Sequence, residues 1–167
     1  MKRTVKLIFL PALLITLMFV YGCPIALNFP PDEPGTVKID KALLGTWICK
    51  QDSSCEVLTA KLEKLDDYSY NVEVLEKGEM YATEDVVFTG YVTKIDNLNI
   101  LYLLEKSSGK YYNYVYEVSG KSLTIYDLSL LEGGVDAVTS TEALRAQIVA
   151  SKYKEGFMAE PKQYRRN

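Results

Sequence analysis

The chain has 167 residues, of which 48% are hydrophobic and 25% charged, a length that suits one domain with a substantial core. Its formal charge of −3 argues against a nucleic-acid partner, because proteins that bind phosphate backbones need clustered Lys and Arg. The sequence contains no histidine, which excludes Ser-His-Asp, Cys-His and other imidazole-based catalytic arrangements.

The N-terminal segment 1–22 is typical of a secretory signal peptide. It begins with the basic residues Lys2, Arg3 and Lys6 and continues with an apolar stretch over 7–20. That stretch is shorter than the ~18 or more apolar residues of a membrane-spanning helix. We therefore expect the segment to direct export and to be removed, rather than to remain as a membrane span.

The residues at the end of this stretch resemble the lipobox of bacterial lipoproteins. Val20, Tyr21, Gly22 and Cys23 stand where that motif has an aliphatic residue, a small residue, Gly or Ala, and Cys. The resemblance implies cleavage before Cys23, a diacylglycerol on its thiol and an acyl chain such as palmitate on its amine, which together give a stable membrane anchor. An ordinary signal peptide with a chance cysteine is the alternative. Because Pro24 rather than Asp follows the cysteine, the resemblance implies the outer membrane in a cell that has one.

Removal of this segment makes the chain more acidic. Lys and Arg fall from 19 to 16 against 22 Asp and Glu, so the formal charge changes from −3 to −6. Such a chain is not expected to bind nucleic acid, or to dock electrostatically on anionic lipid. Three basic residues near the C-terminus, Lys162, Arg165 and Arg166, are interpreted as a solvated tail rather than a binding patch.

The segment 23–36 is expected to be a tether. Four prolines and a glycine lie between residues 24 and 35. This composition cannot continue a helix or pair as a central strand, and it favours an extended, semi-rigid spacer. We therefore expect a lipidated tether over 23–36 and one domain over 37–167.

Two further cysteines, Cys49 and Cys55, are expected to form a structural disulfide, because export places them in an oxidising compartment. A hairpin turn centred near Asp52 would set them opposite each other. Two cysteines without histidine are too few soft ligands for a structural zinc ion, and their five-residue gap is not the spacing of thiol oxidoreductases. We expect no metal and no cofactor.

The domain is expected to be all-β. Apolar and polar residues alternate over seven stretches separated by turn residues: 44–51, 56–65, 68–74, 86–95, 98–105, 110–118 and 122–128. Residues 79–83 extend the fourth of these stretches or form an eighth. Short alternating stretches with close turns predict a small antiparallel up-and-down barrel, or a strongly curved sheet, of about seven or eight strands.

One helix is predicted over about 139–155. Thr139 and Glu142 have the spacing of a capping box, and Gly156 supplies a stop. Leu144 and Ile148 lie on one face, so we expect the helix to pack on the outside of the sheet.

Gly45 and Trp47, at the start of the first predicted strand, resemble the Gly-x-Trp motif that opens lipocalins and related small barrels. With the tether, the up-and-down strands and the late helix, they make residues 37–155 similar in layout to small bacterial lipocalin-like lipoproteins, many of which have no assigned function. The resemblance implies a barrel that binds a small hydrophobic ligand.

A tyrosine row is the most distinctive interior feature. Strand alternation places Tyr112, Tyr114 and Tyr116 on one face. These rings are candidate ligand contacts, since they offer apolar faces and hydroxyl groups. The alternative is that they cover a core or a sheet face. Trp47 is a further candidate contact, or else a plug at the closed end of the barrel.

The remaining acid–base groups are tyrosines and carboxylates, and the visible acids are Asp66, Asp67, Glu84, Asp85 and Asp127. Acids in turns usually cap the backbone or face solvent, so we predict no enzyme. Three hypotheses are kept: a non-catalytic, membrane-anchored module that binds a small hydrophobic ligand; an envelope protein-interaction or inhibitor module with a filled barrel; and, ranked lowest, an enzyme. A hollow apolar lumen favours the first and a packed lumen with an exposed aromatic patch the second. A buried pair of carboxylates in a cleft would favour the third.

Overall fold

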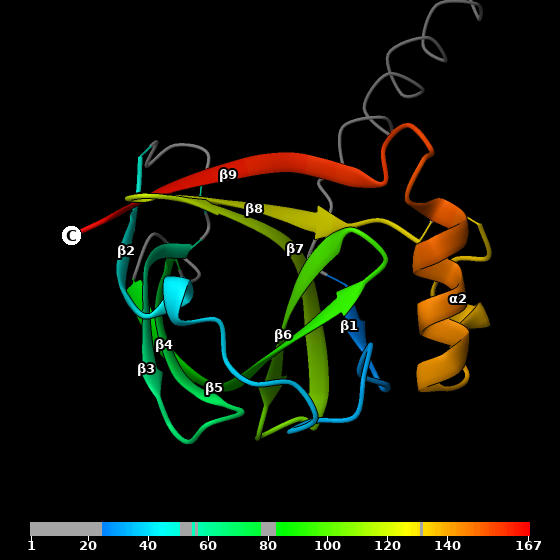
Figure 1. The fold of residues 1–167 in the computed structure, drawn as a ribbon, viewed down its shortest axis with the longest axis horizontal. Helices are drawn as coiled ribbons and strands as arrows, with labels where there is room; N and C mark the ends of the chain where they lie inside the picture. Colours follow the sequence, from blue (N-terminus) through cyan, green and yellow to red (C-terminus); the bar gives the residue numbers. More distant parts are fainter. Residues whose placement is uncertain (1–24, 51–54, 56, 78–82, 131) are drawn as a thin grey trace, which may run out of the picture.

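The computed structural model describes residues 25–50, 55, 57–77, 83–130 and 132–167, and the described chain forms an antiparallel barrel of eight strands (Figure 1). In chain order the barrel strands are β2 (Gly45–Cys49), β3 (Val57–Lys64), β4 (Tyr70–Lys77), β5 (Thr83–Ile95), β6 (Leu98–Glu105), β7 (Lys110–Ser119), β8 (Ser122–Leu128) and β9 (Met158–Arg166). Each strand pairs with the next, and β9 pairs with both β8 and β2, which closes the barrel. The predicted small antiparallel barrel with a late helix is confirmed.

Seven of the barrel strands lie where the alternation predicts them. The strand predicted from residue 86 begins earlier, at Thr83, because its first residues pair with the end of β4 as far as Lys77. The other residues of the uncertain stretch, 79–82, lie outside the described chain.

The eighth barrel strand, β9, is absent from the sequence prediction. The interpretation of Lys162, Arg165 and Arg166 as a solvated tail is wrong, because β9 pairs Lys162 with Ile125 of β8 and Arg166 with Trp47 of β2. Among the three, only Arg165 is exposed. The strand lacks a clear apolar alternation because two of its inward-facing residues carry charge.

The helix α2 (Thr141–Ser151) connects β8 to β9 and packs against the outer wall of the barrel, as predicted (Figure 1). Leu144 and Ile148 are fully buried in a second hydrophobic core with Ile100 of β6 and other outward-facing residues. The N-cap is Ser140 rather than Thr139. The Ser140 hydroxyl accepts a 3.1 Å hydrogen bond from the backbone amide of Ala143, the third residue of the helix, which is the usual partner of an N-cap side chain.

The described part of the expected tether packs on the barrel. Strand β1 (Ala26–Leu27) pairs with β7 and buries Leu27, and Pro31 is fully buried as well. One Asp32 carboxylate oxygen accepts a 2.6 Å hydrogen bond from the Thr93 hydroxyl and lies 3.3 Å from the Arg145 guanidinium. The expectation of an extended spacer is therefore wrong for residues 25–32, because strand pairing, buried side chains and an ion pair hold them to the domain. Cys23 lies outside the described residues.

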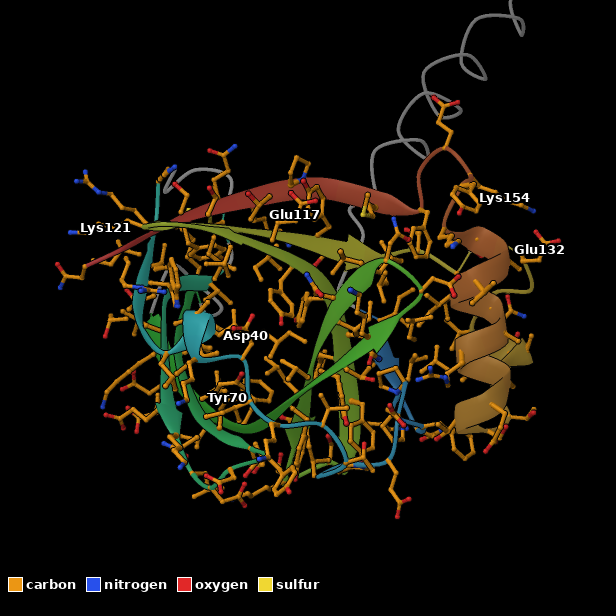
Figure 2. All side chains as sticks on the ribbon, in the orientation of Figure 1. Asp40, Tyr70, Glu117, Lys121, Glu132 and Lys154 are labelled. Atoms are coloured by element: carbon orange, nitrogen blue, oxygen red, sulfur yellow. A yellow bond between two sulfur atoms is a disulfide. The ribbon has the colours of Figure 1, made fainter. Side chains whose placement is uncertain are left out.

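One end of the barrel is closed by the short 3₁₀ helix η1 (Lys41–Leu43). The fully buried Trp47 donates a 2.8 Å hydrogen bond from Nε1 to the Leu43 carbonyl. The Tyr70 hydroxyl donates to the Asp40 carbonyl over 2.9 Å, and Figure 2 shows these two residues side by side. The Tyr116 hydroxyl donates to the Asp40 carboxylate over 3.1 Å. These bonds fix the segment before β2 across the barrel end.

The predicted disulfide between Cys49 and Cys55 is confirmed. The Cα atoms are 6.4 Å apart, and both side chains are buried. The bridge ties the end of β2 to the residues just before β3, while the turn expected between them, at 51–54, lies outside the described chain.

Candidate functional site: a cavity in the barrel

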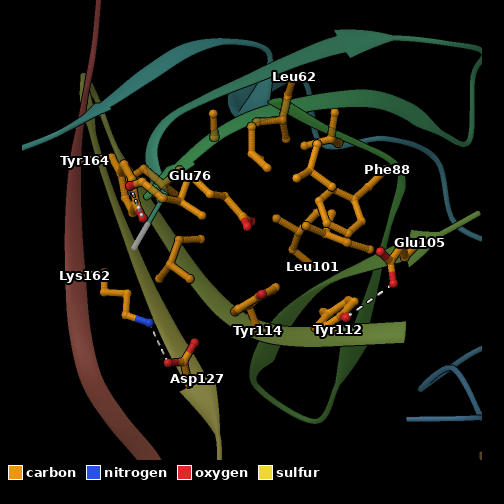
Figure 3. A pocket seen from close by; sticks show the side chains of 18 residues that line it. Leu62, Glu76, Phe88, Leu101, Glu105, Tyr112, Tyr114, Asp127, Lys162 and Tyr164 are labelled. Carbon is orange, nitrogen blue, oxygen red and sulfur yellow. Dashed lines mark hydrogen bonds and ion pairs between the residues drawn. The ribbon is translucent and has the colours of Figure 1, made fainter. Parts of the chain in front are cut away.

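A cavity of about 300 Å³ lies inside the barrel, on the side away from η1, and residues of β3 to β9 line it (Figure 3). The strands that run in the same direction as β2 end at this side. Because η1 immediately precedes β2, it covers the opposite end, which side chains fill. The barrel is therefore packed at one end and hollow towards the other.

Most of the cavity wall is apolar. Every second residue of each strand faces inward, and in β4, β6 and β8 these positions carry mainly Val, Leu and Ile. The deepest part of the wall includes Leu62, Val72, Leu101 and Leu123, all of which are buried. This surface favours the hydrocarbon part of a ligand.

Charged side chains gather near the strand ends at the hollow side. Glu76, Glu105 and Asp127 continue the inward-facing series of β4, β6 and β8, and Lys162 faces them from β9. Figure 3 shows the Glu76 carboxylate directed into the cavity. The cavity thus has an apolar interior and a polar end.

Asp127 and Lys162 form an ion pair within this polar end. Lys162 Nζ lies 2.7 Å from Asp127 Oδ2. The Lys162 side chain is only 14% exposed and the Asp127 side chain 17%. The second carboxylate oxygen, Asp127 Oδ1, is buried and has no hydrogen-bond donor among the described residues. One acceptor of this carboxylate therefore remains open to a ligand donor.

Tyr114 lies directly across the β7–β8 pair from Asp127. Burial raises the pKa of the Tyr114 phenol well above its usual value, and the Asp127 carboxylate adds to this effect. Within the described chain its hydroxyl makes no hydrogen bond, and the ring borders the cavity (Figure 3). Tyr114 is therefore a neutral hydroxyl beside an anionic group.

Tyr112 borders the same cavity nearer its edge. Its hydroxyl lies 3.4 Å from Glu105 Oε2, and its ring meets the Phe88 ring edge to face at 5.8 Å. The Ser108 hydroxyl donates to the Glu105 carboxylate, and this bond, with a smaller contribution from Tyr112, lowers the pKa of Glu105. Glu105 is thus an anion at neutral pH.

The structure brings two of the four candidate ligand residues to the cavity. Tyr112 and Tyr114 line it, whereas Trp47 and Tyr116 lie at the closed end. Tyr116 shares the inward face of β7, but it is far enough along the strand to reach Asp40 below η1. Trp47 lies where its alternative role, a plug at the closed end of the barrel, would place it.

Three charged residues of the site were not identified from sequence: Glu76, Glu105 and Lys162. The first two carry a recognisable signal, since each ends a series of inward-facing apolar residues. In β4 the series is Val72, Val74 and then Glu76. Lys162 has no such signal, because β9 itself was not predicted.

Two further features were sought in the described part of the chain, a metal-binding cluster and a membrane-spanning helix. This part of the chain holds no group of three or more Cys, Asp or Glu side chains arranged to bind a metal ion. None of its helices has the length and hydropathy needed to cross a bilayer. Comparisons with protein-family models, with curated proteins and with solved structures find no match to the chain.

Proposed function

We propose that this protein is a non-catalytic binding module, anchored by lipid in the cell envelope, whose barrel holds one small and largely apolar ligand. The cavity of about 300 Å³ with apolar walls carries this proposal. A cavity of roughly 150 Å³ accommodates benzene, so a ligand of about 10–12 non-hydrogen atoms suits this one.

The hollow lumen favours ligand binding over an interaction module with a filled barrel. Eight-stranded barrels are narrow enough for side chains to fill completely, or to leave room for one small ligand. An apolar cavity of this size costs stability on the order of several kcal/mol, and a ligand that fills it recovers contacts. Asp127, a carboxylate of the cavity, is paired with Lys162 rather than with a second acid, so we propose binding rather than acid catalysis.

The lipid anchor is proposed from the residues around Cys23, and the lipocalin-like resemblance of Gly45 and Trp47 agrees with a binding role. Cells that express the full chain and receive labelled palmitate should incorporate label into this protein. The Cys23→Ser variant should carry none and should leave the membrane fraction. Equal labelling of the variant would contradict the anchor.

Ligand binding is tested by non-denaturing mass spectrometry of residues 24–167, a fragment that contains the whole barrel and both cores, secreted into a periplasm and purified without detergent. We expect extra mass that is lost on denaturation. Ala60→Phe places a ring in the cavity and should abolish the extra mass, whereas Lys61→Phe places it on the outer face of the same strand and should not. A bare chain, also after incubation with small apolar compounds, would reject the proposal.

A further inference from the structure

We propose that the cavity selects an amphipathic organic cation, that is, a protonated or quaternary amine carried on an apolar body of about 10 non-hydrogen atoms. This inference deepens the proposed binding function and rests on it. Four observations at the cavity support it: the balance of charges, an open acceptor, the aromatic rings and the apolar interior.

The charges that line the cavity are predominantly negative. Among the described residues that line the cavity, three carboxylates, those of Glu76, Glu105 and Asp127, face one ammonium group, that of Lys162, which leaves a formal charge of −2. Lys162 is already paired with Asp127, so these residues offer no unpaired cation to an anionic ligand. Because like charges repel and opposite charges attract, a carboxylate ligand such as a fatty acid is disfavoured beside these groups and a cation is favoured.

The open hydrogen-bonding position at the polar end of the cavity is an acceptor. Asp127 Oδ1 is buried without a donor in the described chain, while Oδ2 already receives Lys162. Glu76 projects into the cavity from β4, three strands around the barrel from β9 (Figure 3). An ammonium group can donate to the first carboxylate and face the second, so the site matches a donor better than another acceptor.

Aromatic rings line the same cavity as these carboxylates. Phe88, Tyr112 and Tyr114 border the cavity, and Tyr164 faces it from β9. The faces of such rings attract ammonium groups, and aromatic rings combined with carboxylates are a recurrent way to bind amines. The Leu and Val side chains deeper in the barrel then cover the apolar body of the ligand.

The test compares three ligands that share an eight-carbon chain and differ only in the head group: octylamine, octan-1-ol and octanoate. Isothermal titration calorimetry with residues 24–167 at pH 7 and low salt gives each dissociation constant. We expect octylamine to bind at least tenfold more tightly than octanol, and octanoate to bind most weakly. Equal or tighter binding of octanol or octanoate would overturn the cation preference while leaving the binding function intact. No binding of any of the three would reject the binding function itself.

A matched pair of variants locates the preference in the cavity. Glu76→Gln removes a carboxylate that faces the lumen, and Glu73→Gln removes one from the exposed outer face of the same strand, where Glu73 pairs with Lys61. Glu76→Gln should weaken octylamine binding at least fivefold and leave octanol unchanged, and Glu73→Gln should change neither. An equal loss of octylamine binding in both variants would show a general effect of protein charge and would overturn the inference.

Discussion

The guanidinium carbon of Arg166 lies 4.5 Å from the centre of the Trp47 ring, so the last strand of the chain covers the tryptophan of the first barrel strand. Arg166 also donates a hydrogen bond to the carbonyl of Ala42, within η1. The contact joins β9 to η1 and β2, which lie next to each other in the chain and far from β9 in sequence, and thereby fixes the closed end of the barrel.

Arg166→Ala should lower the free energy of unfolding by about 2 kcal/mol, because it removes the contact with the ring and a charged hydrogen bond. Urea titration followed by fluorescence of Trp47, the single tryptophan, measures this change. Arg165→Ala is the control, because Arg165 is exposed on the outer face of β9, next to Arg166 in the chain. This substitution should change the free energy of unfolding by less than about 0.5 kcal/mol. Similar losses in the two variants would contradict a specific role for Arg166.

Lys162→Met should lower the free energy of unfolding by about 3 kcal/mol, because it leaves the Asp127 carboxylate without its partner inside the barrel. Replacing both residues, as Asp127→Leu with Lys162→Met, should restore most of the lost stability. The double-mutant cycle in urea measures the coupling between the two side chains. A double variant that is less stable than Lys162→Met alone would show that the pair does not act as a unit.

Removal of the disulfide by Cys49→Ala with Cys55→Ala should lower the free energy of unfolding by about 2 kcal/mol, since the bridge closes a short loop in the unfolded chain. The variant should still fold, because β2 retains its pairing with both β3 and β9. Circular dichroism and urea titration of both proteins check the two statements. Unchanged stability in the variant would mean that the bridge does not constrain the unfolded chain.

Stability should fall above pH 10. Burial raises the pKa values of several tyrosines above the ordinary value of 10.0, most strongly those of Tyr70, Tyr102, Tyr114 and Tyr116. The folded state favours the neutral phenol, so this contribution is fully present below pH 10 and is lost as the pH rises towards the higher folded-state values. Absorbance at 295 nm should show these tyrosines ionising together with unfolding. Ionisation of all the tyrosines near pH 10 in a protein that stays folded would contradict the prediction.

The sequence predicts most of the barrel because its strands bury one face and expose the other. In β4, for example, Tyr70, Val72 and Val74 are buried while Glu73 is exposed. This period of two is visible in a single strand, without knowledge of its neighbours. The same signal predicts the inward face of β7 and hence two residues of the cavity, Tyr112 and Tyr114.

The parts that the sequence does not predict depend on partners far along the chain. In β9, Lys162 and Arg166 face inward because Lys162 forms an ion pair with Asp127 and Arg166 stacks on the Trp47 ring. Strand β1 has two residues, too few for any pattern, and its position depends on the exposed edge of β7. Such pairings depend on residues far apart in the sequence. Local composition alone therefore predicts a tail in place of β9 and a tether in place of β1.

The position of β1 also limits how far the barrel can stand from a membrane. Ala26 is three residues beyond Cys23, and an extended chain spans at most ~3.5 Å per residue, which gives a reach of about 10 Å. In the lipid-anchored form, β7 therefore lies next to the lipid headgroups, and the domain cannot sample the space further from the bilayer. Such a module would exchange its ligand with the membrane surface and its immediate surroundings.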